Sequence, residues 1–213
     1  MIRGFGGKIV QRITQWSFSR WSTYDECPYR AKLLFIEKRK APGSPAMDRG
    51  DRIHKAAEAF IKGEAKTLDP ELKPVATHVL RYKKLAARSE IMLAVTREWV
   101  STGWFDANVW ALIKIDVLAL ITTGKTMTAE VVDYKTGKYK PESESYAKQL
   151  SLYAAGTLAT YPDVNRVETK LLFTDHNKTV KETYERDELP ELKATWEERV
   201  APMLADTVFA PRP

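Results

Sequence analysis

The sequence contains a single cysteine, Cys27, and no long apolar run. One cysteine excludes an internal disulfide and any metal cluster held by several cysteines of one chain. No apolar stretch approaches the ~18 residues that a membrane-spanning helix needs, and no apolar segment typical of a signal peptide follows the N-terminus. Internal repeats and low-complexity stretches are also lacking. We therefore expect a cytoplasmic protein without membrane contact.

The composition is that of an ordinary globular chain. Its 213 residues are 44% hydrophobic and 29% charged, which is enough for one domain to bury a sizeable core. We expect a single domain with three parts: an N-terminal helical segment (1–46), a central core (47–185), and a C-terminal helix and tail (186–213).

Positive charge is concentrated in residues 1–40. Nine basic and three acidic residues lie there, an excess of six that equals the +6 of the whole chain. Cations interleaved with aromatic rings are typical of a groove for single-stranded nucleic acid, which makes Arg20, Arg30 and Trp21 candidate DNA contacts. The alternative is an amphipathic helix pair whose rings lie in the core. The interleaved rings are Trp16, Phe18, Trp21, Tyr24 and Tyr29.

Hydrophobic periodicity predicts helices first and strands later. This order indicates an α/β or α+β domain with a mixed sheet. Ser17 or Ser19 is suited to cap a first short helix, and Pro28 is suited to begin a second. The further elements that we expect are helices at about 48–61, 69–88 and 145–160, strands at about 91–99, 108–121 and 126–134, a hairpin of 166–174 and 179–185, and a last helix from Pro190 that Pro202 interrupts or ends.

Two aspartates are predicted to face each other across a hairpin. If the turn centres on Gly124 and Lys125, paired residues have numbers that add to 249, as Asp116 and Asp133 do. Their Cβ atoms would then lie ~4.5–5.5 Å apart on one face of the sheet. Two carboxylates among apolar neighbours repel each other, and a divalent cation such as Mg²⁺ compensates them best.

Lys135 lies two residues beyond Asp133 and therefore points to the same face. A lysine beside a metal-bound water can help to deprotonate it or stabilise charge that develops on a phosphate. The alternative is a pair of strand-end aspartates with a surface lysine. A register shift of one residue would also place Asp116 on the opposite face.

The same residues resemble the RecB-like exonuclease branch of the PD-(D/E)XK nucleases, which includes CRISPR-associated RecB-like nucleases and many phage exonucleases. The resemblance extends from Ser17 to Pro213 and implies a restriction-endonuclease-like α/β core, in which helices flank a mixed central sheet. Five segments carry it in order: Ser17–Arg30, similar to S-x-S-x-L-x-x-y-x-x-C-P-x-k; Gly50–His54, similar to G-x-x-x-H; Lys114–Asp116; Val132–Lys138; and Gln149–Tyr153, similar to Q-x-x-x-Y.

The resemblance also implies roles for individual residues. For two of the residues an alternative without a catalytic role stays open: His54 could be a core histidine, and Tyr153 could simply pack in its helix. One or two Mg²⁺ or Mn²⁺ ions would be held by His54, Asp116, Asp133 and the backbone carbonyl of Tyr134, with Lys135 as the catalytic lysine and with Gln149 and Tyr153 contacting or orienting DNA.

The chain departs from the family pattern at two places. Ile113 stands where the family usually has glycine. Many relatives hold an iron–sulfur cluster on four cysteines, whereas Cys27 is alone here. We therefore predict no iron–sulfur cluster and expect Cys27 to be a small buried residue.

Taken together, the motifs predict a metal-dependent DNA exonuclease that acts in recombination, repair or phage DNA processing. DNA ends are the expected substrate, and a recombination or single-strand-binding protein is a candidate partner. Two alternatives remain open: a non-catalytic DNA-binding accessory protein on the same fold, and an endonuclease.

Overall fold

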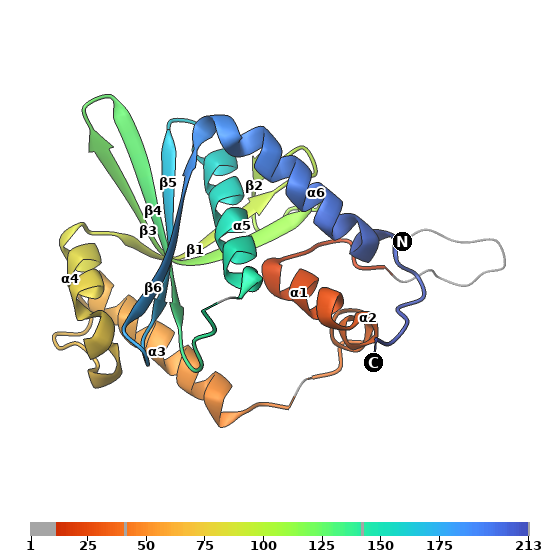
Figure 1. Cartoon of the computed structure of the whole chain (residues 1–213), viewed down its shortest axis with the longest axis horizontal. Helices are drawn as coiled ribbons and strands as arrows, with labels where there is room; N and C mark the ends of the chain where they lie inside the picture. The colour runs from red at the N-terminus through yellow and green to blue at the C-terminus, as the bar shows by residue number, and fades with distance from the viewer. Residues whose placement is uncertain (1–11, 41, 142, 213) are drawn as a thin grey trace.

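A computed structural model describes residues 12–40, 42–141 and 143–212, and it has a mixed six-stranded sheet at its centre (Figure 1). The strand order is β2-β1-β3-β4-β5-β6. All neighbouring strands are antiparallel except β4 and β5, which are parallel and are joined through helix α5, because a parallel pair needs a crossover connection. The strands are β1 (Arg88–Val95), β2 (Ser101–Thr102), β3 (Ala111–Thr123), β4 (Thr126–Lys135), β5 (Arg166–Phe173) and β6 (Lys178–Glu185).

Helices cover both faces of the sheet, as expected for an α/β nuclease core (Figure 1). One core lies between the sheet, α5, α6 and α1, and the other lies between the sheet, α3 and α4. None of the helices in the described ranges is both long and apolar enough to span a membrane. The helical elements are α1 (Phe18–Glu26), α2 (Pro28–Ala31), the π-helical turn η1 (Lys32–Ile36), α3 (Pro45–Lys62), the 3₁₀ segment η2 (Pro70–Val75), α4 (Ala76–Lys84), α5 (Glu144–Thr160), the 3₁₀ turn η3 (Arg186–Glu188) and α6 (Leu189–Ala205).

The helices near the site are capped by local sequence signals, although α3 begins at Pro45, three residues before the expected start at about residue 48. The Ser17 side chain caps α1 by accepting a hydrogen bond from the Arg20 backbone N–H, and Pro28 occupies the first turn of α2. Ser44 caps α3 in the same way, and Gly63 ends α3 with a left-handed φ of 81°, a conformation that glycine adopts without steric cost.

The boundaries of further elements also differ from those that the sequence predicts. The expected helix at 69–88 is a 3₁₀ segment followed by the shorter α4, because Pro74 has no backbone N–H to continue an α-helix from Pro70. Strand β1 begins at Arg88, three residues earlier than expected, and ends before Trp99. Pro202 neither interrupts nor ends α6, which continues to Ala205.

Most of the N-terminal aromatic residues belong to the core, as in the alternative given above. Trp16, Trp21 and Tyr24 are all buried. The Trp16 ring stacks on Trp196 of α6 with centroids 5.4 Å apart, and the Trp21 indole N–H donates to the backbone carbonyl of Arg199 at 3.1 Å. These contacts attach α1 to α6, so the aromatic residues fix the position of the N-terminal helix.

Candidate active site

The β3–β4 register is the predicted one. All pairs from Val117–Val132 to Thr123–Thr126 have residue numbers that add to 249. The regular ladder stops one pair before Asp116 and Asp133, where the Asp116 Oδ2 atom accepts a hydrogen bond from the Tyr134 backbone N–H at 2.8 Å. The two carboxylates thus lie where β3 and β4 stop pairing, and the Asp116 side chain takes over the Tyr134 backbone N–H at that point.

Asp133 is held mainly through one of its two oxygens. Its Oδ1 atom accepts hydrogen bonds from the Tyr153 hydroxyl at 2.5 Å and from the Gln149 side-chain amide at 3.2 Å. The Lys135 Nζ atom lies 2.8 Å from Oδ2. That contact does not have the angles of a hydrogen bond, so Oδ2 is a buried oxygen without a hydrogen-bond donor among the described residues. Asp133 is only 6% exposed, and a buried oxygen in this state is costly unless a further cation binds it.

His54 reaches the same place from helix α3. Its Nδ1 atom lies 3.0 Å from Asp116 Oδ2. Gly50, one turn earlier on α3, lies beside the end of β4: a Cβ atom there would be in ordinary contact with the Thr136 hydroxyl oxygen, at 3.4 Å.

Burial and neighbouring charges shift the pKa values of both His54 and Asp116. Burial alone would lower the pKa of His54, but the hydrogen bond and negative charge of Asp116 raise it above the ordinary value. The pKa of Asp116 is raised by burial and by the nearby Asp133, and its contacts with His54 and the Tyr134 N–H do not cancel this. The carboxylate pair therefore has a deficit of positive charge, which is the condition that attracts a cation.

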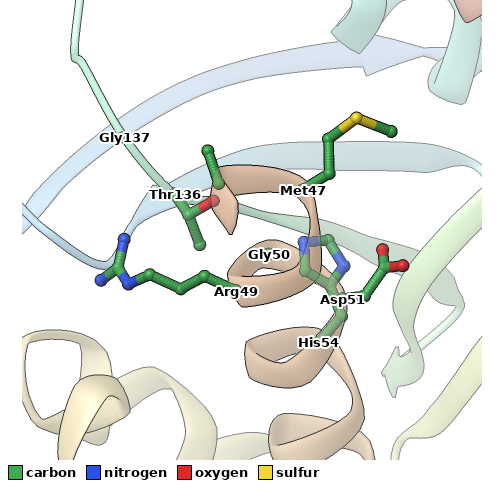
Figure 2. Close-up of a pocket in the computed structure, with 8 residues that line it drawn as sticks. Met47, Arg49, Gly50, Asp51, His54, Thr136 and Gly137 are labelled. Atoms are coloured by element: carbon green, nitrogen blue, oxygen red, sulfur yellow. The ribbon is translucent and has the colours of Figure 1, made fainter. Parts of the chain in front are cut away.

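The site opens into a hollow of about 300 Å³. A second hollow of about 450 Å³ lies over the first half of α3 (Figure 2). Asp51 and His54 line both, and Figure 2 shows these two side chains on one side of α3 with Arg49 pointing away. The first hollow is lined by residues of α1, α3, β3, β4 and α5, among them Ser17, Phe18, His54, Asp116, Asp133 and Tyr153.

The donor atoms at the base of the hollow fit a hard divalent cation. Atoms of His54, Asp116 and Glu90 lie within 4.8 Å of one another, and carboxylate oxygens with an imidazole nitrogen suit Mg²⁺ or Mn²⁺. Asp133 Oδ2, which has no hydrogen-bond donor among the described residues and an ion-pair contact with Lys135, adds a further oxygen. Sequence reasoning missed Glu90 because the expected strand began at residue 91; an acidic residue directly before an apolar run was the available signal.

The predicted DNA-contacting residues lie in two different environments. Gln149 and Tyr153 are buried, 8% and 4% exposed, and bond to Asp133, so they orient a carboxylate and their contact with DNA stays a prediction. Arg20 is half-buried, donates to the Gln15 carbonyl at 2.9 Å and lies over the Phe35 ring.

The remaining predicted residues lie outside the hollow. Arg30 is exposed and forms an ion pair with Glu26 at 2.9 Å. Trp21 is buried in the core, and we remove it from the candidate DNA contacts. Cys27 is partly exposed where α1 meets α2, so its expected full burial is wrong.

Comparison with known proteins gives a family and two distant structural relatives. The profile of the family described as "PD-(D/E)XK nuclease superfamily" matches residues 15–213. A crystal structure described as "SSO0001" has 16% identity and a TM-score of 0.48, covering 97% of this chain and 82% of the other. A "Putative exonuclease" from Eubacterium rectale has 13% identity and a TM-score of 0.48, covering 93% and 84%. Curated protein sequences give no match.

Proposed function

The chain belongs to the PD-(D/E)XK nuclease superfamily, and on this premise we propose that it is a divalent-metal-dependent deoxyribonuclease that hydrolyses phosphodiester bonds from DNA ends. One observation carries the proposal. The carboxylates of Asp116 and Asp133 lie at the end of a ladder beside Lys135, and one buried oxygen of Asp133 has no hydrogen-bond donor.

Three side chains and one carbonyl would hold the cation. They are His54, Asp116, Asp133 and the backbone carbonyl of Tyr134. A cation bound there polarises the scissile phosphate and lowers the pKa of a coordinated water. Mg²⁺ and Mn²⁺ both suit these donors.

Lys135 acts on the reacting atoms directly. Its Nζ atom lies beside Asp133, and its side chain is 28% exposed, so the ammonium group can reach a phosphate that enters the hollow. There the ammonium group stabilises the negative charge that develops on the phosphate; to take the proton of the attacking water instead, Lys135 would have to be a neutral amine.

Gln149 and Tyr153 act as positioning residues for Asp133. Burial together with the Asp133 charge raises the pKa of Tyr153 well above 10, so the hydroxyl keeps its proton and remains a donor to Asp133 Oδ1. The Gln149 amide donates both to Asp133 and to the Tyr153 oxygen, at 3.2 and 2.7 Å. The pair therefore fixes Oδ1 and leaves Oδ2 for the cation.

The preference for ends is supported by the likeness to the RecB-like branch. The Gln149–Tyr153 motif and the basic segment before residue 41 are the features that argue for this branch over sequence-specific endonucleases. In this proposal Arg20 and Arg30 guide the DNA strand, and the enzyme serves recombination, repair or phage DNA processing.

The test is cleavage of end-labelled single- and double-stranded linear DNA with Mn²⁺. We expect Lys135→Ala to lose about 10²–10³-fold in rate, the usual loss when one group that stabilises the transition state is removed. Lys125→Ala is the matched control, because Lys125 lies exposed at the β3–β4 turn, and it should keep the wild-type rate. Lys135→Ala with full activity would refute the active-site assignment.

Two further substrates separate the alternatives. Closed circular DNA should stay intact with an exonuclease, whereas cleavage of the circle would identify an endonuclease. No cleavage of any substrate, with equal DNA affinity in the presence and absence of metal, would identify a non-catalytic DNA-binding protein.

A further inference from the structure

Glu90 lies at an interruption of the sheet. The β1–β3 ladder pairs Ser89 with Val117 and then resumes at Ile91 with Ile115, so Glu90 and Asp116 face each other where regular pairing is absent. The Glu90 backbone has a φ of 53°, which is the left-handed region that an acidic residue within a strand rarely adopts. The register is the same on both sides of the interruption, so Glu90 keeps its place opposite Asp116.

The interruption brings the Glu90 carboxylate to the site. Oxygen atoms of Glu90 and Asp116 and a ring nitrogen of His54 lie within 4.8 Å of one another. The Glu90 side chain is 26% exposed, so the group is neither fully solvated nor sealed in the core. Three donors from β1, β3 and α3 therefore meet at one point.

Lys114 supplies the positive charge at this point. Its Nζ atom pairs with Glu90 Oε2. The Lys114 side chain is 58% exposed. It can therefore swing into solvent when another cation arrives.

A second buried oxygen faces the same hollow. Asp133 is 6% exposed, and its Oδ2 atom has no hydrogen-bond donor among the described residues, only the ion-pair contact with the Lys135 Nζ atom at 2.8 Å. Asp133 lines the same hollow as His54 and Asp116. One lysine therefore stands beside each end of the carboxylate group, Lys135 at Asp133 and Lys114 at Glu90.

We propose that Glu90 is a ligand of the divalent cation in this site, together with His54 and Asp116, and that the Lys114 ammonium occupies the cation's place until the cation binds. The inference rests on the proposed nuclease function, because the cation is the one that the reaction needs. It adds a fourth acidic or imidazole ligand from a strand that carries none of the family motifs quoted above.

The first test measures Mn²⁺ binding to the full chain without DNA by isothermal titration calorimetry. Glu90→Gln keeps the shape of the side chain but removes its charge, and we expect the affinity for Mn²⁺ to fall at least about 10-fold. Glu182→Gln is the matched control, since Glu182 is an exposed strand glutamate on β6. Unchanged affinity in Glu90→Gln would overturn the proposal.

The second test is a double-mutant cycle with the same readout. Lys114→Met should tighten Mn²⁺ binding about 10-fold in the wild-type background, because the competing ammonium group is gone, and should have a much smaller effect in the Glu90→Gln background. An equal effect of Lys114→Met in both backgrounds would contradict the proposal that the cation replaces the Lys114 ammonium group beside Glu90. If Glu90→Gln does not fold, the single variant Lys114→Met still decides, because unchanged or weaker binding overturns the proposal.

DNA cleavage is measured separately, so that the two proposals can fail independently. Cleavage by the wild type with normal Mn²⁺ binding by Glu90→Gln would refute the role of Glu90 and leave the nuclease. Glu90-dependent Mn²⁺ binding without cleavage of any DNA would refute the nuclease and leave the cation site.

Discussion

Two buried carboxylates on strand β4, only three residues apart, differ in how many hydrogen-bond donors and cations surround them. Glu130 is 4% exposed and Asp133 is 6% exposed. The Glu130 Oε2 atom accepts hydrogen bonds from Arg81, Tyr82 and Lys170 at 2.7–2.9 Å. Asp133 has hydrogen-bond donors on Oδ1 only, and its Oδ2 atom has an ion-pair contact with the Lys135 Nζ atom at 2.8 Å.

The pKa of Glu130 and the pKa of Asp116, the second carboxylate of the site, are shifted in opposite directions. Burial alone would raise the pKa of Glu130, but Lys170, Tyr82 and Arg81 hold it below its ordinary value. Asp116, the neighbour of Asp133 across the hairpin, has a raised pKa because burial and the second carboxylate outweigh His54. A buried carboxylate with enough donors stabilises the fold, whereas a pair with too few marks a place for a cation.

Removing Glu130, the carboxylate with donors from three side chains, should have the largest effect. The quantity that changes should be the stability of the fold. Glu130→Ala leaves the charges of Arg81 and Lys170 partly buried without their partner, so we expect the free energy of unfolding to fall by about 3–5 kcal/mol. Denaturant-induced unfolding followed by circular dichroism measures this loss. The cleavage rate per folded molecule should stay near the wild-type value. A loss of stability under ~1 kcal/mol would contradict the proposed difference between Glu130 and Asp133.

Removing the unbalanced carboxylate should affect activity and spare the fold. Asp133→Asn keeps an oxygen for the Tyr153 and Gln149 donors but removes the charge that binds the cation, so we expect the cleavage rate to fall about 10²–10³-fold, or about 2.7–4 kcal/mol. The free energy of unfolding should remain the same or rise, since repulsion with Asp116 is relieved. A variant that is both active and destabilised would reverse the assignment of the two carboxylates.

The cation itself should stabilise only the unbalanced region. At a Mn²⁺ concentration 100 times the dissociation constant, we expect the wild type to gain about 2.7 kcal/mol in free energy of unfolding. Asp116→Asn should gain much less, because Asp116 contacts His54 and lies opposite Asp133. Thermal unfolding with and without Mn²⁺, with Mg²⁺ in parallel, measures the difference; an equal gain in both proteins would place the binding elsewhere.

The sequence predicted the Asp116–Asp133 register because the short turn at Gly124 allows little choice. Once the turn is set, the alternation of the strands decides which side chains share a face. The role of His54 came from the family resemblance instead, because a histidine on a helix could equally be a core residue. Local geometry was therefore sufficient for the register of the two aspartates, and the resemblance supplied the histidine.

Features that depend on distant segments were not predictable in the same way. The burial of Trp21 depends on α6, almost 180 residues later in the chain. The hydrogen bonds of Gln149 and Tyr153 to Asp133 depend on how α5 crosses the sheet, although their common helix face was evident from the spacing. The position of Glu90 depends on an interruption of the β1–β3 ladder, for which the sequence carries no clear signal.

A third carboxylate, Asp175, sharpens the comparison because it is well paired but open to water. It accepts from the Arg49 guanidinium at 2.6 and 3.0 Å and from the Gly137 backbone N–H at 2.8 Å. These contacts join α3 to the loop after β4. The hydrogen bonds from Arg49, opposed by burial, lower its pKa to about 2.

Its effect on stability should therefore be small and should depend on pH. Because the pKa of Asp175 is lower in the folded than in the unfolded chain, its contribution is complete above about pH 5 and is lost as the pH falls toward 2. Solvent screening limits that contribution to about 1 kcal/mol at neutral pH. We expect Asp175→Asn to lower the free energy of unfolding by that amount at pH 7 and by less at pH 3, as measured by urea titration at both values. A gap that is the same at both pH values would mean that Asp175 acts through its shape and hydrogen bonds alone, and that charge balance distinguishes only the buried carboxylates.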